Sequence, residues 1–288
     1  MSILSRTRNA AVKLDLHCHS TCSDGSLAAA DVARRAGDYG VELFSLTDHD
    51  TFSGFEDTVE ALAGTGATVL RGMELSCKDH GRTVHLLLYD LQEGPGLDAV
   101  RTRTERIFVA RTERLREICG RLAKLGHQLD PEAILAQTHG VPGRPAVAKA
   151  LVQAGICTSM KESFSRFLRD GGPADVPVER VSLRDGLDLG LGAGAKASLA
   201  HPHTFGAFAL VESICRRYRD HGLTGLEALY GRYGKAERTG WLRLVDKFDM
   251  VATGGSDFHG EAIPDVTRPG IELDAPRSEL LSQWLLAD

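Results

Sequence analysis

The chain has 288 residues, of which 42% are hydrophobic and 25% are charged, and its formal net charge is −5. This length suits either one α/β barrel domain or two ordinary domains. The acidic balance excludes a protein that coats nucleic acid or membrane through bulk positive charge. A phosphorylated substrate would therefore have to meet a local basic patch or metal ions.

Cysteine usage and the N-terminus indicate a cytoplasmic protein. Six cysteines are scattered along the chain without paired CxxC spacing. A chain of this size needs no disulfides to hold its core together, so we expect free thiols. Residues 1–15 contain no apolar run long enough for a signal peptide, and no stretch of about 18 apolar residues predicts a membrane span.

Short strand patterns alternate with helical patterns in the first third of the chain. Strands are expected at 12–17, 41–50, 67–77 and 83–91, and helices at 26–40 and 53–64. Ser26 is a suitable N-cap for the first of these helices, and Gly40 is a suitable end for it. Alternation of this kind predicts parallel βα units in an α/β fold.

From Leu97 to about residue 190 the pattern is helical. One long helix is expected at 97–126 and shorter helices at 130–140, 143–155 and 160–172, before the strand-like run at 173–183. Strands resume at 195–205, 224–230 and 248–259, separated by helices at 211–222 and 235–248. We therefore expect a helical insertion after the fourth of seven main strands.

Histidines and carboxylates occur where the predicted strands end. In the segment LDLHCHSTCSDG at 14–25, His17 and His19 share one face of a strand, and Asp15 lies deeper on that face, where it would orient a ligand. Further groups of this kind are Asp24, Asp48, His49, Glu74, His201, Asp257 and His259, while His85 lies within the fourth strand. The carboxyl ends of parallel barrel strands converge on one face, so we expect these side chains to meet.

Metal ions account best for such a gathering. A single residue such as His85, between Val84 and Leu86, is more often a satisfied core histidine than a ligand. Nine such groups in apolar surroundings, however, need counter-charge, because buried charge is costly. Imidazole and carboxylate ligands suit Mn²⁺, Fe²⁺ or Zn²⁺, with Mn²⁺ preferred, and nine ligands are too many for one ion. The sequence therefore predicts two or three divalent ions bound by His17, His19, Asp24, His49, Glu74, His85, His201, Asp257 and His259.

The motifs that carry these residues resemble those of a known family. They are DLHCHS at 15–20, SDG at 23–25, TDHD at 47–50, GMELS at 72–76, VH at 84–85, AHP at 200–202 and GSDFH at 255–259. They are similar, in order and over almost the whole chain, to the motif series of the PHP (polymerase and histidinol phosphatase) metallophosphoesterases. With the helical insertion and GRPAVAKALV at 143–152, the chain resembles the TrpH-type branch of nucleoside 3′,5′-bisphosphate phosphatases and 5′-to-3′ oligoribonucleases.

The resemblance implies a fold and a distribution of ligands. The fold would be a distorted (β/α)7 barrel formed by residues 1–96 and 191–288, with residues 97–190 as a helical insertion that caps the substrate. One metal would be held by His17, His19, Glu74 and Asp257; Glu74 would bridge to a second held by His85 and His201; and Asp24, His49 and His259 would hold a third. The implied reaction is attack of metal-bound hydroxide on the phosphorus of a phosphate ester.

The resemblance also bears on the substrate. Arg144 matches the branch's phosphate-binding arginine at the start of a helix, where Pro145 suits the first helical position, against the alternative of an ordinary surface cation. Two further anchors are missing, because Gly-Gly-Pro at 171–173 replaces an expected lysine and His203-Thr204 replaces an expected arginine. His203 is a candidate for protonating the leaving oxygen, although the sequence leaves open whether it faces the site.

Several functions therefore compete. The first is hydrolysis of the 3′-phosphate of nucleoside 3′,5′-bisphosphates, or of the 5′ ends of short oligoribonucleotides. The missing anchors favour a small-metabolite phosphatase, such as one for histidinol phosphate. A regulatory metal-binding module is disfavoured by the complete ligand set, and a C–N hydrolase by the lack of a lysine at any strand end. The basic excess of the helix at 97–126 fits either an oligonucleotide path or a solvated helix, and the sequence favours no oligomeric state.

Overall fold

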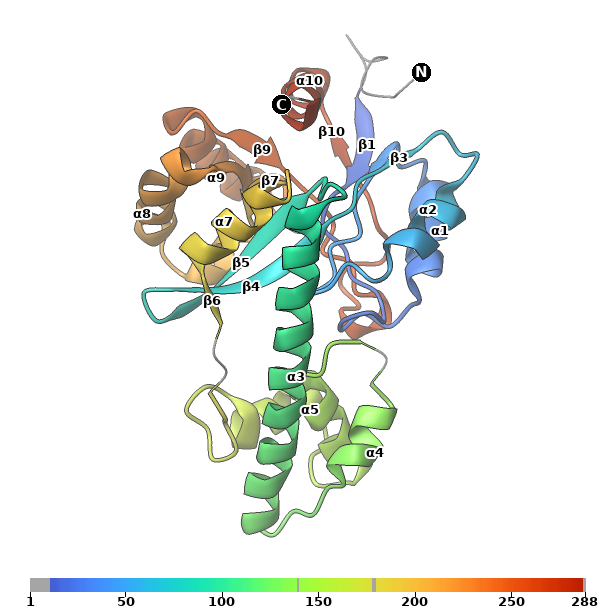
Figure 1. The fold of residues 1–288 in the computed structure, drawn as a ribbon, viewed down its shortest axis with the longest axis vertical. Coiled ribbons are helices and arrows are strands. Elements are labelled where there is room, and N and C mark those ends of the chain that lie inside the picture. The colour runs from blue at the N-terminus through green and yellow to red at the C-terminus, as the bar shows by residue number, and fades with distance from the viewer. Residues whose placement is uncertain (1–10, 139, 178–179, 287–288) are drawn as a thin grey trace. The chain divides into compact units, whose positions relative to one another are not determined.

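The computed structural model of the chain describes residues 11–138, 140–177 and 180–286. It divides into two units: unit 1 is Met1–Arg101 with Val181–Asp288, and unit 2 is Thr102–Arg180 (Figure 1). Unit 2 falls within the range 97–190 expected for the insertion, and α7 (Leu183–Gly192) packs on strands of unit 1. The N-terminal segment 1–10, expected to carry no signal peptide, lies outside the described residues.

Unit 1 contains two β-sheets, which make the fold mixed α/β. The first has the order β10-β1-β2-β3, with β1 at Val12–Asp15, β2 at Leu43–Phe44, β3 at Thr68–Val69 and β10 at Ile271–Leu273. The second has the order β6-β4-β5-β7-β8-β9, with β4 at Met73–Asp79, β5 at Arg82–Tyr89, β6 at Val181–Ser182, β7 at Lys196–Leu199, β8 at Leu223–Glu227 and β9 at Val251–Thr253. Two isolated parallel bridges, Cys18 to Phe258 and His49 to Glu74, connect segments of the two sheets. Among the described residues the strands thus form two bridged sheets, and the seven-stranded barrel implied by the resemblance is not seen as one closed sheet.

Two local features depart from the expected parallel strands. The strand expected at 67–77 divides at Gly72 into β3 and β4, where a Cβ would lie 2.1 Å from Ser45 Oγ, so only glycine fits. β5 runs antiparallel to both β4 and β7, contrary to expectation. The turn between β4 and β5 is formed by His80 and Gly81, both with positive φ (44° and 80°), as tight hairpin turns require.

The helices of unit 1 confirm the four expected there and add two. They are α1 (Ala29–Tyr39), α2 (Phe55–Leu62), α7, α8 (Phe208–Tyr218), α9 (Lys235–Lys247) and α10 (Ala275–Leu286), of which α7 and α10 were not predicted. α1 ends at Gly40 with φ of 82°, as expected, but its N-cap is Ala28 rather than Ser26. α1 packs beside α2 over a core that includes Val32, Phe44 and Phe258.

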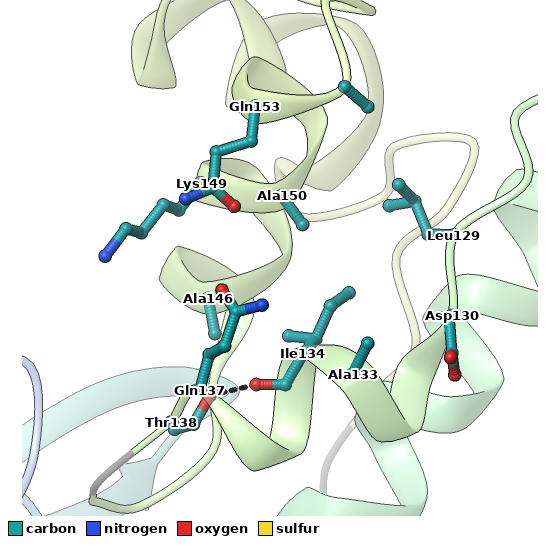
Figure 2. A pocket seen from close by; sticks show the side chains of 11 residues that line it. Leu129, Asp130, Ala133, Ile134, Gln137, Thr138, Ala146, Lys149, Ala150 and Gln153 are labelled. Atoms are coloured by element: carbon teal, nitrogen blue, oxygen red, sulfur yellow. Dashed lines mark hydrogen bonds between the residues drawn. The ribbon is translucent and has the colours of Figure 1, made fainter.

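Unit 2 is helical, as expected. It contains most of α3 (Pro95–Lys124), then α4 (Pro131–Ala136), α5 (Arg144–Gln153), α6 (Met160–Ser163) and a π-helical turn at Phe164–Leu168. Its core is built from Leu115, Leu122, Val147, Leu151 and Leu168. α4 and α5 line a pocket between Ile134 and Ala150, with Lys149 and Gln153 beside it (Figure 2). None of the predicted site residues lines this pocket.

The six cysteines are free, as expected, and five of them are buried. Burial raises the pKa of Cys119 to about 11 and that of Cys215 to about 12, so both thiols stay protonated and act as core residues. In the described ranges, every helix is too short or too polar to cross a membrane.

Glycines on one face of α7 allow the helix to lie close to the β4–β5 hairpin. A Cβ on Gly190 would lie 2.4 Å from Leu88 Cδ2, whereas a Cβ on Gly192 of the same helix would meet no atom within 4 Å. We expect Gly190→Ala to lower the free energy of unfolding by about 1–3 kcal/mol through overpacking. Gly192→Ala should change it by less than about 1 kcal/mol, in the stabilising direction. Urea denaturation of both variants measures this, and equal effects would contradict the packing described.

Candidate metal centre

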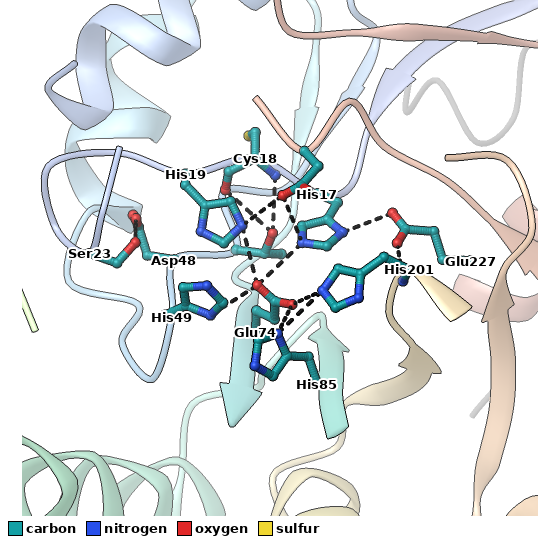
Figure 3. A network of polar contacts seen from close by, with 12 residues as sticks. His17, Cys18, His19, Ser23, Asp48, His49, Glu74, His85, His201 and Glu227 are labelled. Atoms are coloured by element: carbon teal, nitrogen blue, oxygen red, sulfur yellow. Dashed lines mark hydrogen bonds and ion pairs between the residues drawn. The ribbon is translucent and has the colours of Figure 1, made fainter. Parts of the chain in front are cut away.

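Glu74, at the start of β4, lies at the centre of a cluster of histidines in unit 1 (Figure 3). Its side chain is 1% exposed, and ring nitrogens surround both of its oxygens. Oε1 lies 2.8 Å from His85 Nδ1 and 2.9 Å from His201 Nε2. Oε2 lies 3.0, 3.2 and 3.3 Å from ring nitrogens of His49, His19 and His17 respectively. One carboxylate therefore contacts five imidazoles from four separate motifs.

Two aspartates complete the cluster. Asp257 Oδ1 lies 3.3 Å from His19 Nε2 and 3.5 Å from His17 Nε2. Asp24 Oδ1 lies 3.3 Å from His259 Nε2, and its Oδ2 lies 3.7 Å from His49 Nε2. All nine residues predicted as ligands are thus brought together.

The ligand atoms form four overlapping groups, each with its atoms within 4.8 Å of one another. The groups are His19, Asp24, His49 and His259; His17, His19 and Asp257; His17, Glu74 and His201; and His49, Glu74 and His85. Four residues belong to two groups each, which is the arrangement that neighbouring ions with shared ligands require. His85 and His201, expected as partners, fall in different groups, although their ring nitrogens lie only 3.3 Å apart.

The strands explain how distant segments reach one place. His17 and His19 follow β1, His49 follows β2, and Asp257 follows β9, as expected for parallel strands. His85 lies inside β5, where it pairs with Ser76 of β4, because β5 runs in the opposite direction. Its position within a strand, rather than at its end, follows from that reversal.

Two of these residues have strained backbones. His201 has φ of 24° and Asp257 has φ of 55°, in the region that favours glycine. Such conformations cost on the order of 1–3 kcal/mol each and persist where surrounding contacts impose them. Both belong to the cluster, although Asp50, His80, Asp90 and Asp249 also have positive φ, so such conformations are not confined to the ligands.

The residues fit metal ions bound through nitrogen and oxygen. Several buried atoms of the cluster have no hydrogen-bond partner within the described part of the chain: His17 Nε2, both ring nitrogens of His19, His49 Nδ1 and Glu74 Oε2. Each such atom costs about 1–3 kcal/mol when left unsatisfied. Lone pairs of this kind, directed at a common volume, are what divalent cations with imidazole and carboxylate ligands satisfy.

Carboxylates and histidines of the cluster shift one another's pKa values, and burial, the largest influence at His49, lowers the pKa of that ring to about 4. Burial would lower the pKa of His17, but the carboxylates of Glu227, Glu74 and Asp257 outweigh it and raise that pKa well above its usual value. Burial opposes the same change at His19, where Asp257 and Glu74 raise the pKa to about 10. Burial would raise the pKa of Glu74, but the histidines around it lower it well below the usual range. Bound cations would replace protons on these histidines.

Two buried aspartates hold the loops that carry ligands. Asp15 accepts hydrogen bonds from the backbone N–H and the hydroxyl of Ser256, at 2.9 and 2.5 Å, beside Asp257. Asp48 accepts from the Ser20 N–H at 2.8 Å, from the Ser20 hydroxyl at 2.6 Å and from the Ser23 hydroxyl at 2.5 Å. Both carboxylates thus orient the ligand-bearing segments through hydrogen bonds to residues next to the ligands. This is the role expected for Asp15.

Sequence reasoning missed Glu227 and Tyr230. Glu227, the last residue of β8, is fully buried and contacts His17 Nδ1 at 2.8 Å and the His201 N–H at 2.6 Å. Tyr230 donates its hydroxyl to Asp257 Oδ2 at 2.7 Å. A signal for Glu227 was available, because it is the one carboxylate in the apolar run LTGLEALY at 223–230.

His203 lies beside the cluster and outside the four ligand groups. Its ring centroid is 6.2 Å from that of His201, and its Nδ1 lies 2.8 Å from the Tyr233 hydroxyl. Burial and the charge of His201 lower its pKa, so the ring is mainly neutral at neutral pH. A neutral imidazole must gain a proton before it can act as a general acid.

Arg144 is the first residue of α5 in unit 2, the helix position that the sequence predicted. Its Nη1 donates to Asp170 Oδ1 at 2.6 Å and to the Leu168 carbonyl at 2.9 Å, and lies 3.7 Å from Asp175 Oδ1. The guanidinium therefore takes part in an ion-pair network within unit 2. Among the described residues, its hydrogen bonds and ion pairs are made by Nη1.

Comparison with known proteins agrees with the cluster. The PHP domain model matches residues 15–138. A 5′-3′ exoribonuclease of Haemophilus influenzae is 30% identical over 249 residues, covering 86% of this chain and 90% of the relative. A 3′,5′-nucleoside bisphosphate phosphatase of Chromobacterium violaceum is 28% identical over 277 residues, covering 89% and 94%. A solved structure from Chromobacterium violaceum, described as an amidohydrolase with bound sulfate and no metal, matches with a TM-score of 0.79 and 28% identity over 92% of both chains. The chain therefore belongs to the PHP family and is a metal-dependent phosphoesterase.

Proposed function

We propose that the chain hydrolyses phosphate esters of nucleotides, at the 3′-phosphate of nucleoside 3′,5′-bisphosphates or at the 5′ ends of short oligoribonucleotides. The observation that carries this proposal is the convergence of nine nitrogen and oxygen ligands around Glu74, with buried atoms left unsatisfied. The names of the two relatives described above supply the substrate class.

We assign the ligands to three ions, with Mn²⁺ preferred and Fe²⁺ or Zn²⁺ also suitable. The first is held by His17, His19, Glu74 and Asp257, the second by Glu74, His85 and His201, and the third by Asp24, His49 and His259. When bound, ions at such a site activate water as a nucleophile and draw charge from phosphoryl oxygens. The chain positions them through Glu74, while Tyr230 orients Asp257 by its hydrogen bond.

Arg144 is proposed to bind a substrate phosphate and to stabilise charge that develops on it. Its Nε and Nη2 suit a two-point contact with phosphate. His203 is proposed to protonate the leaving oxygen. The low pKa of its ring means that this contribution falls as pH rises above its pKa.

Residues 97–190 are proposed to cap the substrate, and residues 1–96 and 191–288 to carry the catalytic part. Mononucleotides are favoured over long strands because arginines of α3 are already paired, Arg116 with Glu113 and Glu132, and Arg121 with Glu117. The free cysteines support a cytoplasmic location.

A small-metabolite phosphatase is the second proposal, because one observation favours it. Gly171, Gly172 and Pro173 stand where the branch would place a lysine, and Thr204 follows His203 where it would place an arginine. A ligand with one phosphate would need fewer anchors than a nucleoside bisphosphate.

The substrate assignment predicts the products of one reaction. The Mn²⁺-loaded protein should convert adenosine 3′,5′-bisphosphate to 5′-AMP and inorganic phosphate, resolved by chromatography. Arg144→Ala should lower kcat/KM by about 10- to 100-fold, as expected for loss of a charge-assisted contact of about 1.5–3 kcal/mol. Arg116→Ala, a paired arginine on an exposed helix face, is the matched control and should retain full activity. Cleavage of 4-nitrophenyl phosphate without conversion of the bisphosphate would favour the small-metabolite phosphatase.

The ligand assignment predicts that the replacement of two different carboxylates removes different ions. Glu74→Gln should remove the first two ions and lower kcat about a thousandfold, which corresponds to about 4 kcal/mol of transition-state stabilisation. Asp24→Asn should remove only the third ion. Metal content by inductively coupled plasma mass spectrometry tests both variants. The same loss of metal in each would contradict the assignment of separate subsites.

A further inference from the structure

We propose that Glu227 is a positioning residue that fixes the ring of His17 and the backbone of His201 together, so that two metal subsites depend on one buried carboxylate. The inference rests on the proposed function in taking both histidines as ligands. Glu227 ends β8, and its side chain lies between these two residues (Figure 3).

The first contact selects one form of His17. Glu227 Oε1 lies 2.8 Å from His17 Nδ1, and both side chains are 0% exposed. A carboxylate only accepts hydrogen bonds, so Nδ1 must carry the proton. In the neutral ring, the lone pair is then on Nε2, which lies 3.3 Å from Glu74 Oε2 and 3.5 Å from Asp257 Oδ1. Glu227 thus directs the ligating nitrogen toward the cluster.

The second contact supports a strained backbone. The His201 N–H donates to Glu227 Oε2 at 2.6 Å, and His201 has φ of 24° and ψ of 66°. In this conformation His201 Nε2 lies 2.9 Å from Glu74 Oε1. A charge-assisted hydrogen bond from the backbone offsets part of the strain and keeps the ring aimed at Glu74.

A role in stability alone does not explain why a carboxylate is buried at position 227. The Glu227 carboxylate is fully buried, and within the described ranges it contacts His17 and His201 rather than a lysine or arginine. Burial of a carboxylate costs several kcal/mol unless positive charge lies close by. The proposed cations, held by the two histidines that Glu227 contacts, would supply that charge.

Replacement of Glu227 by glutamine should remove one of the two hydrogen bonds. Gln has nearly the shape of Glu but offers one acceptor oxygen and one donor nitrogen, so Glu227→Gln cannot accept from both partners. We expect Mn²⁺ affinity at the subsites of His17 and His201 to fall by about 10- to 100-fold. The third ion, held without either residue, should be retained. Equilibrium dialysis with metal analysis measures the Mn²⁺ affinity and the number of ions that each protein binds.

A spectroscopic readout reports the His17 tautomer directly. In zinc-loaded protein labelled with ¹⁵N-histidine, wild-type His17 should show a protonated Nδ1 and a metal-bound Nε2. Glu227→Gln should weaken or remove the Nδ1–H signal. Glu227→Asp keeps the charge but is one methylene shorter, so it should recover part of the affinity and serves if the glutamine variant does not fold.

Asp79→Asn is the matched control for loss of a buried carboxylate. Asp79 accepts hydrogen bonds from Arg217 and Tyr218, and in the part of the chain that the structure describes these partners lie outside the cluster. It should lower stability and leave metal affinity and the His17 signal unchanged. The inference is overturned if Glu227→Gln keeps wild-type affinity and the Nδ1–H signal, or if Asp79→Asn loses metal to the same extent. Failure of the wild-type protein to cleave any phosphate ester would overturn the proposed function instead, while zinc binding and the His17 Nδ1–H signal of the zinc-loaded wild-type and Glu227→Gln proteins would still test Glu227.

Discussion

The contact between the Glu74 carboxylate and five imidazole rings is the constraint on which the rest of unit 1 depends. Charge of either sign is costly in a core, so neither the carboxylate nor the rings could be buried alone. Together they are tolerable only if the total charge is balanced, by protons in the metal-free protein and by cations when ions are bound. Strand ends, strained residues and the carboxylates of Asp15 and Asp48 all serve to keep these groups in one volume.

Much of this site could be predicted because each ligand stands at a recognisable point of a short apolar strand. His17, His49 and Asp257 follow strands whose burial is visible in their composition, and the resemblance to PHP motifs identified the full set. The direction of β5 was less accessible, because alternating helices and strands usually indicate parallel pairing. The pair His80-Gly81 was a usable signal, since a two-residue connection joins only antiparallel strands.

Other features depend on tertiary contacts that no local pattern contains. Gly72, between β3 and β4, lies so close to Ser45 that a Cβ would clash with it, and Ser45 is distant in sequence. The periodicity of 67–77 alone predicts one strand. Glu227 supports two ligands only because β8 lies beside β7 in the folded sheet. The helix position of Arg144 was predicted, but its pairing with Asp170 was not, because the partner lies 26 residues away in a loop. Pattern thus locates ligands better than it locates the groups that orient them.

The hairpin of β4 and β5 also determines when the site can be completed during synthesis. It places Glu74 and His85 together through a turn of two residues, so this pair can form as soon as the hairpin leaves the ribosome. The remaining partners lie before and after the hairpin in sequence, from His17 to His259. A nascent chain therefore presents an incomplete set of ligands until residue 259 has been made. Only after that point would the proposed ions meet the full set of ligands rather than separate histidines.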